Sequence, residues 1–271
     1  MSFIPTRKPL IASKLWTPNR LLTLVGWFDP NDSTKISVTG NIVNSITDKV
    51  SSVVLTSSGS PQLVTLGSKL GIQFLASSSQ YLENANSPTS YAANNVIDNG
   101  ATSRIVVILA RRLGLGQAYN PGLFYYNEFS PGFRGPISGL EAGMLAISSQ
   151  NNWKAYATAP GATVVDTTNL HVLSYLQDDL GAEMYLDGYY QNLGTNSAWN
   201  SNPSAPIGMG RRTPPAANDY LDAIIGEIVV TASVKANKTV ERQKLEGYLA
   251  WRWGIQSSLP SSHPHYYSPP V

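Results

Sequence analysis

The sequence predicts an all-β protein built as an antiparallel sandwich or barrel. Charged residues make up only 13% of the 271 residues, whereas glycine and proline are frequent, which is typical of many short strands joined by turns. About a dozen short apolar segments follow one another without alternating helices, and no repeat of roughly 20–50 residues indicates a propeller or solenoid. With 42% hydrophobic residues the chain can bury a core, so we expect one main domain.

The predicted strands of the first half end in a long β-branched segment. They cover 22–28, 36–38, 42–46, 69–75, 80–84 and 104–112. The segments 36–38 and 42–46 flank Thr39-Gly40-Asn41, a sequence that favours a hairpin turn. The apolar run in 104–112 does not alternate with polar residues, so we expect a strand that is covered on both faces.

The second half repeats the pattern of strand and turn. Shorter strands are predicted within 122–129, 143–148 and 153–158, and the clearest pair is 169–177 with 182–188. A tight turn at Asp187-Gly188 leads into YYQNLG, and the last strands lie in 205–212 and 222–233.

A single helix is predicted at 239–253, close to the end of the chain. At 3.6 residues per turn one face carries Leu245, Tyr248, Leu249 and Trp253. Glu241 suits the first turn, and Gly254 is placed to end the helix. Since one amphipathic helix cannot form its own core, we expect it to pack on the sandwich. Trp251 points to another side, so we expect it to pack under the proline-rich tail 257–271 or under a partner.

Residues 1–20 differ from the rest of the chain. They contain four cations, no acidic residue and three prolines, which leaves the remaining sequence close to −2 out of a net charge of +2. This segment is either a frayed terminus or an extended arm that lies on a neighbouring subunit. For the second reading, the candidate partner-binding residues are Arg7, Lys8, Leu10, Ile11, Lys14 and Trp16. The domain division is then arm 1–20, sandwich 21–256 and tail 257–271.

Several chemistries have few candidate residues in this sequence. No cysteine is present, and G-x-S-x-G does not occur, so thiolate and nucleophile-elbow chemistry are excluded. His263 and His265 have no identifiable third metal ligand. Asp29, Asn31 and Asp32 have the oxygen ligands of a Ca²⁺ site, but Asx residues at such spacing also cap turns. We therefore expect no cofactor and no metal, with calcium as the weaker alternative.

The two ends and the middle of the chain contain recognisable segments. The C-terminal segment reads GEIVV followed by ERQKLEGYLAWRWGIQSSLPSSHPHYYSPP, and the start reads LWTPNRLLTLVGWFDPNDSTKISVTGNIVNSITDKV. The middle contains NLHVLSYLQDDLGAEMYLDGYYQN and PIGMGRR. From Leu15 to Pro270 the chain thereby resembles the laminin-G-like, concanavalin-A-type jelly-roll domains found in bacteriophage and prophage proteins. The chain departs at 46–52, where such domains often read Trp-x-Asp-Lys-Ser-Gly-Asn-Gly.

The resemblance implies an antiparallel jelly-roll sandwich with one C-terminal helix packed on it. Glycosidases of this fold use paired carboxylates on one strand, as in Glu-x-Asp-x-x-Glu, and no such cluster occurs here. Glu183 and Asp187 share a strand face, but the turn explains Asp187, and Glu227 stands alone in an apolar strand. We therefore expect no enzyme and no catalytic residue.

The resemblance also implies a role in a virion. The first expectation is a capsid-decoration, head-fibre or similar accessory subunit that attaches to other virion proteins and forms a homo-oligomer. The alternative is a glycan-binding adhesin or tail-associated receptor-binding module that contacts a host-surface glycan. An accessory domain of a secreted enzyme is disfavoured, because residues 1–20 have no signal-peptide core. The small net charge and the lack of a long apolar run indicate neither nucleic acid nor membrane as partner.

Overall fold

The computed structural model describes ten segments of the chain. They are residues 16–84, 102–116, 121–126, 130–133, 144–148, 154–156, 163–178, 181–195, 206–212 and 220–271.

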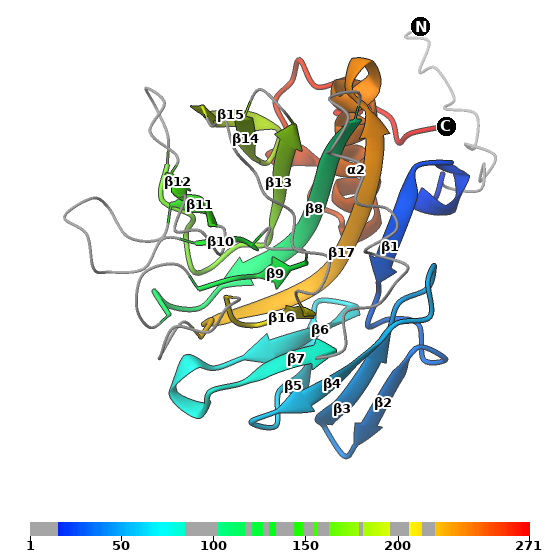
Figure 1. Ribbon diagram of the computed structural model, residues 1–271. Helices are drawn as coiled ribbons and strands as arrows, with labels where there is room; N and C mark the ends of the chain where they lie inside the picture. The colour runs from blue at the N-terminus through cyan, green and yellow to red at the C-terminus, as the bar shows by residue number, and fades with distance from the viewer. Residues whose placement is uncertain are drawn as a thin grey trace, which may run out of the picture.

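The described strands form two antiparallel sheets, one with 14 strands and one with three (Figure 1). The strands are β1 Leu24–Phe28, β2 Ile36–Thr39, β3 Ile42–Thr47, β4 Val54–Ser58, β5 Gln62–Leu66, β6 Lys69–Phe74, β7 Tyr81–Asn84, β8 Thr102–Arg112, β9 Phe124–Tyr125, β10 Ser130–Phe133, β11 Leu145–Ser148, β12 Lys154–Tyr156, β13 His171–Asp178, β14 Gly181–Leu186, β15 Tyr189–Thr195, β16 Ile207–Met209 and β17 Ala223–Val234. In the large sheet, hydrogen-bonded neighbours follow the order β15-β14-β13-β8-β17-β6-β5-β3-β4-β7-β16-β9. In addition, β1 pairs with β17 and β2 pairs with β3. Strands β10, β11 and β12 form the small sheet.

The central strands β8 and β17 separate two apolar layers. Along β8, Val106, Ile108 and Ala110 belong to the inner core between the folded halves of the sheet. Their neighbours Ile105, Val107 and Leu109 belong to a second cluster on the outer face. Because successive side chains of a strand point to opposite faces, a strand buried on both sides must be apolar throughout. The prediction for 104–112 is confirmed.

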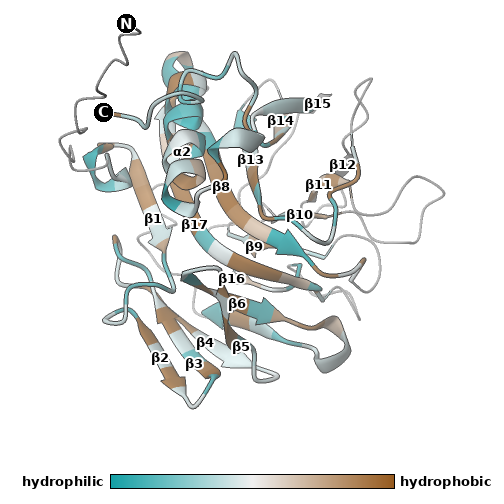
Figure 2. Cartoon of the chain, turned by 180° about the vertical axis from the view of Figure 1, so that it is seen from behind, coloured by the Kyte–Doolittle hydropathy of each residue, from teal (hydrophilic) through white to brown (hydrophobic). Residues whose placement is uncertain are grey.

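The outer layer is covered by the helix α2, which spans Lys238–Trp253 and lies across β8, β17 and β13 (Figure 2). The predicted apolar face is buried, with Leu245, Tyr248, Leu249 and Trp253 all in the outer cluster. Gly254 ends the helix in a left-handed conformation, with φ at 72°. It is the one α-helix among the described residues, so the predicted fold class is confirmed: an antiparallel β-sandwich with a single C-terminal helix packed on it. Within the same residues, no helix is long and apolar enough to span a membrane.

The proline-rich tail packs on α2 and the neighbouring turn. The Trp251 indole donates a hydrogen bond to the His265 carbonyl at 2.7 Å, which confirms that this tryptophan lies under the tail. Leu259 is buried in the outer cluster. A Cβ on Gly247 would lie 2.5 Å from the Cβ of His265, so the tail approaches the helix where there is no side chain.

Trp16 and three strands differ from the expectations. Trp16 is only 3% exposed and its ring lies 6.1 Å from that of Tyr248, so it belongs to the outer layer of its own chain rather than to a free arm. Strands β4, β5 and β10 were not predicted. In β4 the burial alternates, with Leu55 buried and Val54 and Thr56 exposed, but the residues around Val54 are apolar in succession and show no alternation in the sequence.

The loop after β3 reaches its conformation without the family's tryptophan and glycines. The Asp48 carboxylate accepts hydrogen bonds from the backbone amides of Trp27, Val50 and Ser51. Ser52 takes the left-handed conformation, with φ at 60°, that a glycine adopts more easily. A buried aspartate thus organises this loop.

Candidate ligand-binding groove

Two adjoining hollows form a groove on the surface where α2 ends. The first, of about 320 Å³, is lined by the β5–β6 turn at 66–69, by Leu170 and by the helix end at 251–254. The second, of about 240 Å³, is lined by 65–67, Arg111, 168–170 and Ile255. Because both hollows share Leu66, Gly67 and Leu170, we treat them as one groove, called the helix-end groove below.

The β5–β6 turn is held in place by a side chain from another loop. The Asn31 side chain accepts a hydrogen bond from the Leu70 amide at 2.8 Å and donates one to the Leu70 carbonyl at 3.2 Å. Gly67 provides the positive φ, 63°, that the turn requires. The turn therefore forms a fixed wall of the groove.

The other two walls are held by their own backbone contacts. At the end of α2, the amide of Gly254 caps the carbonyls of Ala250 and Trp251, and the Ile255 amide also bonds to Ala250. In the loop before β13, the Asp166 carboxylate accepts hydrogen bonds from the backbone amides of Thr168 and Asn169, both at 2.8 Å. An Asx turn of this kind fixes the loop locally.

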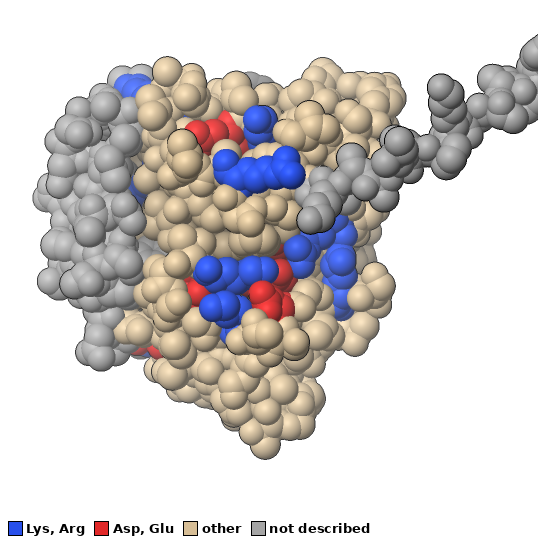
Figure 3. Space-filling view, turned by 90° about the vertical axis from the view of Figure 1, so that its right-hand side faces the viewer, with Lys and Arg blue, Asp and Glu red and all other residues tan. Residues whose placement is uncertain are grey.

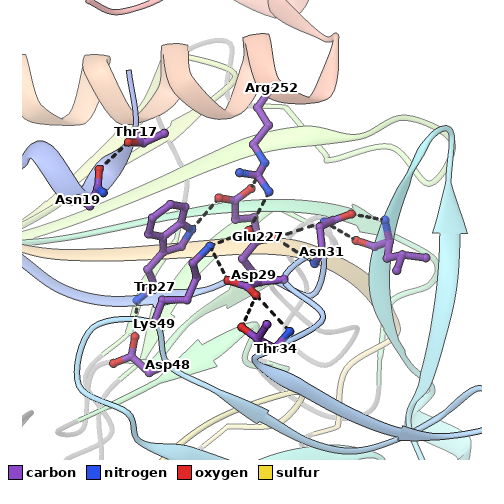
Figure 4. Close-up of polar contacts among 12 residues, drawn as sticks. Thr17, Asn19, Trp27, Asp29, Asn31, Thr34, Asp48, Lys49, Glu227 and Arg252 are labelled. Carbon is purple, nitrogen blue, oxygen red and sulfur yellow. Dashed lines mark hydrogen bonds and ion pairs between the residues drawn. The ribbon is translucent and has the colours of Figure 1, made fainter. Parts of the chain in front are cut away.

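Behind the groove lies a buried polar cluster around Glu227, which Figure 4 shows in part. Glu227 is inaccessible to solvent and accepts hydrogen bonds from the Trp27 indole at 2.7 Å, the Trp253 indole at 3.1 Å and the Tyr248 hydroxyl at 2.9 Å. Arg252 adds an ion pair at 3.1 Å. Burial raises the pKa of Glu227, whereas the Arg252 charge acts in the opposite direction.

The cluster continues to the loop after β1. Arg252 also binds Asp29 at 2.7 Å, and Lys49 binds both Asp29 and Asp32, at 3.2 and 3.1 Å (Figure 4). The Lys49 ammonium lies 3.9 Å from the centre of the Trp27 ring. Helix α2, β17 and the β1–β2 loop are thereby joined, which fixes the side chains of Arg252 and Trp253 at the groove.

Among the described residues, the side chains that line the groove are mainly apolar or cationic, and none is acidic. Lys69 lies 6.0 Å from the Trp253 ring centre and has no carboxylate partner among the described residues. Arg111 is half-buried, and its Nε is buried without a hydrogen-bond partner in that same part of the chain. Figure 3 shows that some cations on one face of the molecule lie beside acidic groups and that others do not.

Of the predicted partner-binding residues, only Trp16 lies within the described residues, and it is buried against Tyr248. The remaining ones lie outside the described segments: Arg7, Lys8, Leu10, Ile11 and Lys14. Their role in partner binding stays a prediction, and Trp16 is better explained as a core residue.

The oxygen ligands considered for calcium take part in turns and ion pairs. Asp29 accepts a hydrogen bond from the Asn31 amide at 3.0 Å, and Asp32 accepts one from Thr34 Oγ1 at 2.6 Å. The hydrogen bond from Thr34 contributes most to lowering the pKa of Asp32. In the described part of the chain no three His, Asp or Glu side chains are grouped so that they could hold a metal ion.

The histidines have partners in the structure. His171 Nδ1 lies 2.6 Å from Asp187, and its Nε2 lies 3.1 Å from Asp166. His263 is buried, with Nε2 3.1 Å from Glu246, a carboxylate that also binds Arg242 at 2.6 Å. These contacts connect the start of β13 to the loop before it and to the β14–β15 turn, and they connect the tail to the helix.

Sequence reasoning did not identify the groove. Lys69, Arg111 and Leu170 come from segments 40 or more residues apart and share no motif. The only local signal was the Gly67-Ser68 turn between two apolar strands, which marks a hairpin but not a binding surface.

The comparisons with known proteins identify a fold. No family model matches the sequence, and no curated protein matches it. Among solved structures, the binding domain of Paraclostridial Mosquitocidal Protein 1 has a TM-score of 0.50 and 11% identity, covering 79% of this chain and 51% of that chain. The receptor binding domain of botulinum neurotoxin mosaic serotype C/D has a TM-score of 0.50 and 9% identity, with coverages of 81% and 49%.

A third similar structure is Domain 4 of AbnA, an extracellular GH43 arabinanase from Geobacillus stearothermophilus, solved in complex with arabinotriose. Its TM-score is 0.48 and its identity 12%, and the match covers 81% of this chain and 98% of that domain. The chain spans about half of the length of the two toxin domains that it matches. At such low identity the likeness to the toxin domains shows the fold alone, which is the β-sandwich of jelly-roll type.

Proposed function

We propose that the protein is a non-catalytic glycan-binding module that acts as an accessory or receptor-binding subunit of a bacteriophage particle. The observation that carries glycan binding is the helix-end groove. It combines two tryptophans, Trp251 and Trp253, with hydroxyl and amide side chains on fixed walls. Aromatic surface beside a few placed polar groups is what a small-ligand site requires. The similar toxin domains, described as binding and receptor-binding, support a binding role by analogy.

The non-catalytic part of the proposal rests on the carboxylate behind the groove and on a carboxylate pair at the opposite, N-terminal end of α2. Glu227 is fully buried, and all its contacts go to the protein, so a substrate cannot reach it. Asp178 and Glu183 lie together on β13 and β14, but both bind Lys238 at 2.6 Å. Burial lowers the pKa of Lys238, but its hydrogen bonds to the two carboxylates raise that pKa overall, so the three form a stable ion-pair group.

A polysaccharide panel tests both parts. The full chain is applied to immobilised β-glucan, agar, alginate and peptidoglycan, and both retention and release of reducing ends are measured. We expect retention on at least one polysaccharide without hydrolysis. Turnover that disappears in Glu183→Gln or Glu227→Gln contradicts the non-catalytic assignment, and absence of retention on a broad glycan array contradicts glycan binding.

The virion part of the proposal rests on the resemblance of the C-terminal segment 226–270 to phage and prophage jelly-roll domains. In this reading the basic arm 1–20 attaches the module to other virion proteins or to copies of itself. The test is whether the protein co-purifies with intact heads or with tails. Deletion of residues 1–14 is expected to preserve the fold, because the described sandwich begins at Trp16, and to abolish incorporation. Full occupancy of the truncated protein contradicts the arm's role.

A further inference from the structure

We propose that the helix-end groove is selective for anionic polysaccharides, with the sugar ring on its tryptophan-lined floor and the acidic group at Lys69 and Arg111. This inference rests on the proposed glycan binding and adds the class of ligand. The acidic group is a carboxylate or a sulfate ester, since both present oxygen acceptors to an ammonium and a guanidinium.

The charge of the groove is the first argument. Lys69 and Arg111 line the two hollows, one in each, and no aspartate or glutamate of the described segments lines either hollow. A third cation in the lining, Arg252, is already neutralised by Asp29 and Glu227. The nearby Asp166 carboxylate is bound to Thr168, Asn169 and His171. The two remaining cations therefore lack a carboxylate partner among the described residues and are available to an anionic ligand.

The buried Nε of Arg111 is the second argument. Desolvating a guanidinium N–H without a partner is unfavourable. The Nε atoms of Arg111, Arg242 and Arg252 are among those buried without a hydrogen-bond partner in the described part of the chain, but Arg242 and Arg252 have carboxylates bound to their guanidinium groups and Arg111 has none there. Arg111 lies on the outer face of β8, beyond the end of the helix, as the alternation from Ile105 to Leu109 requires. A ligand anion in the groove would compensate part of the charge of this side chain.

The apolar part of the lining favours a sugar over an acidic peptide. Leu66 and Trp253 belong to the buried outer cluster, Leu170 packs against it, and the three residues form an apolar part of the lining. A pyranose ring has apolar C–H faces that pack on such a surface while its hydroxyls reach Ser68 and Asn169. A flexible acidic peptide loses more conformational entropy on binding than a stiff polysaccharide does.

Binding of the full chain to four polymers tests the proposal. The probes are polygalacturonate, dextran sulfate, neutral dextran and poly-glutamate, each immobilised at equal density. We expect retention on polygalacturonate or dextran sulfate, and the difference between these two identifies the acidic group. Affinity should fall as salt rises, because the contacts at Lys69 and Arg111 are partly exposed.

The variant Lys69→Gln/Arg111→Gln should bind the retained polymer about tenfold more weakly, with a smaller salt dependence. The control Arg20→Gln/Lys244→Gln removes the same charge from positions outside the groove lining and should bind like the unchanged protein. Ser68→Trp fills the groove from an exposed turn and should also abolish binding. The melting temperature of each variant shows whether it is folded.

The outcomes separate the inference from the proposed function. Retention on neutral dextran that is unchanged in Lys69→Gln/Arg111→Gln overturns the anionic selectivity and leaves glycan binding intact. Equal affinity for poly-glutamate and polygalacturonate overturns the selectivity for sugar. If the two double variants lose binding equally, the groove is not the site. No retention on any polysaccharide, here or on the broad array, overturns both.

Discussion

The strands beneath α2 and the hairpins at the other end of the large sheet differ in how many of their faces are covered. In β17 every residue from Ala223 to Thr231 is buried, because the inner core lies on one side and the outer layer with its helix on the other. In β2 no residue is fully buried, and in β3 only Val43 and Ile46 are. The same sheet thus contains a doubly covered centre and a half-solvated edge, as antiparallel sheets commonly do.

The two regions also treat polar groups differently. Under the helix, Glu227 and Glu246 are inaccessible to solvent, and each is surrounded by several donors. Near the hairpins, Asp32 keeps 25% of its side chain exposed and pairs with Lys49. A buried carboxylate depends on all its partners, whereas an exposed one can exchange them for water. We therefore expect the free energy of unfolding to depend more on the polar contacts under the helix than on those near the hairpins.

The largest effect is expected from Glu227→Gln. The Glu227 carboxylate accepts hydrogen bonds from two indoles and a hydroxyl, and an amide cannot replace all of them. The substitution also leaves Arg252 without one of its two buried carboxylate partners. Breaking such a pair should cost about 3–5 kcal/mol of unfolding free energy, measured by denaturant titration. The control Asp32→Asn should cost about 0–1 kcal/mol. Equal losses at both positions contradict the contrast between the regions.

Truncation of the helix face should have the next largest effect. Leu249 is fully buried between α2 and the sheet, so Leu249→Ala should cost about 2–5 kcal/mol, and Trp253→Ala should cost a similar amount. Val38 in β2 is 41% exposed, so Val38→Ala should change stability by about 0.5 kcal/mol or less. Melting temperatures and denaturant midpoints check both. An unchanged melting profile for Leu249→Ala and Trp253→Ala means that the helix does not complete the fold.

A smaller effect is expected where the tail packs on the helix. In Gly247→Ala the new methyl group lies 2.5 Å from the Cβ of His265 and must displace the tail. We expect a loss of about 1–3 kcal/mol and faster proteolytic cleavage within 257–271. Gln243→Ala, at a half-buried position of the same helix, serves as the control. If cleavage is equally slow in both variants, the tail is not held by this contact.

The smallest effect is a pH dependence at the start of β13, where His171 contacts the β14–β15 turn. Burial lowers the pKa of His171, but Asp187 and Asp166 act more strongly together and raise it overall above its usual value of about 6.5. Protonated His171 therefore stabilises the fold at pH below about 6.5, and this contribution is lost as pH rises through the raised pKa. Melting temperatures over this range should show a fall that is shallower in His171→Gln. Identical slopes contradict the role of the two aspartates.

Much of the fold follows from local patterns in the sequence. The helix boundaries agree with the structure because Gly254 can end a helix, and because an apolar stripe at 3.6-residue spacing matches no strand. The burial of both faces of β8 follows from its continuous β-branched run, since a solvated face needs polar residues at alternate positions. Strands β4 and β5 were missed because polar serines and threonines interrupt their short apolar segments.

Local patterns in the sequence predicted most of the strand segments, the end of the single described helix, and the lack of paired carboxylates of the glycosidase type on one strand. Such features depend on neighbours within a few residues, and local backbone and side-chain physics decides them. Only the tertiary structure decided that Trp16 packs on Tyr248, that Glu227 is enclosed by two tryptophans, and that Lys69 and Arg111 line one groove. These residues are brought together by strand order and helix docking, and no local pattern encodes the distance between residues that lie far apart in the chain.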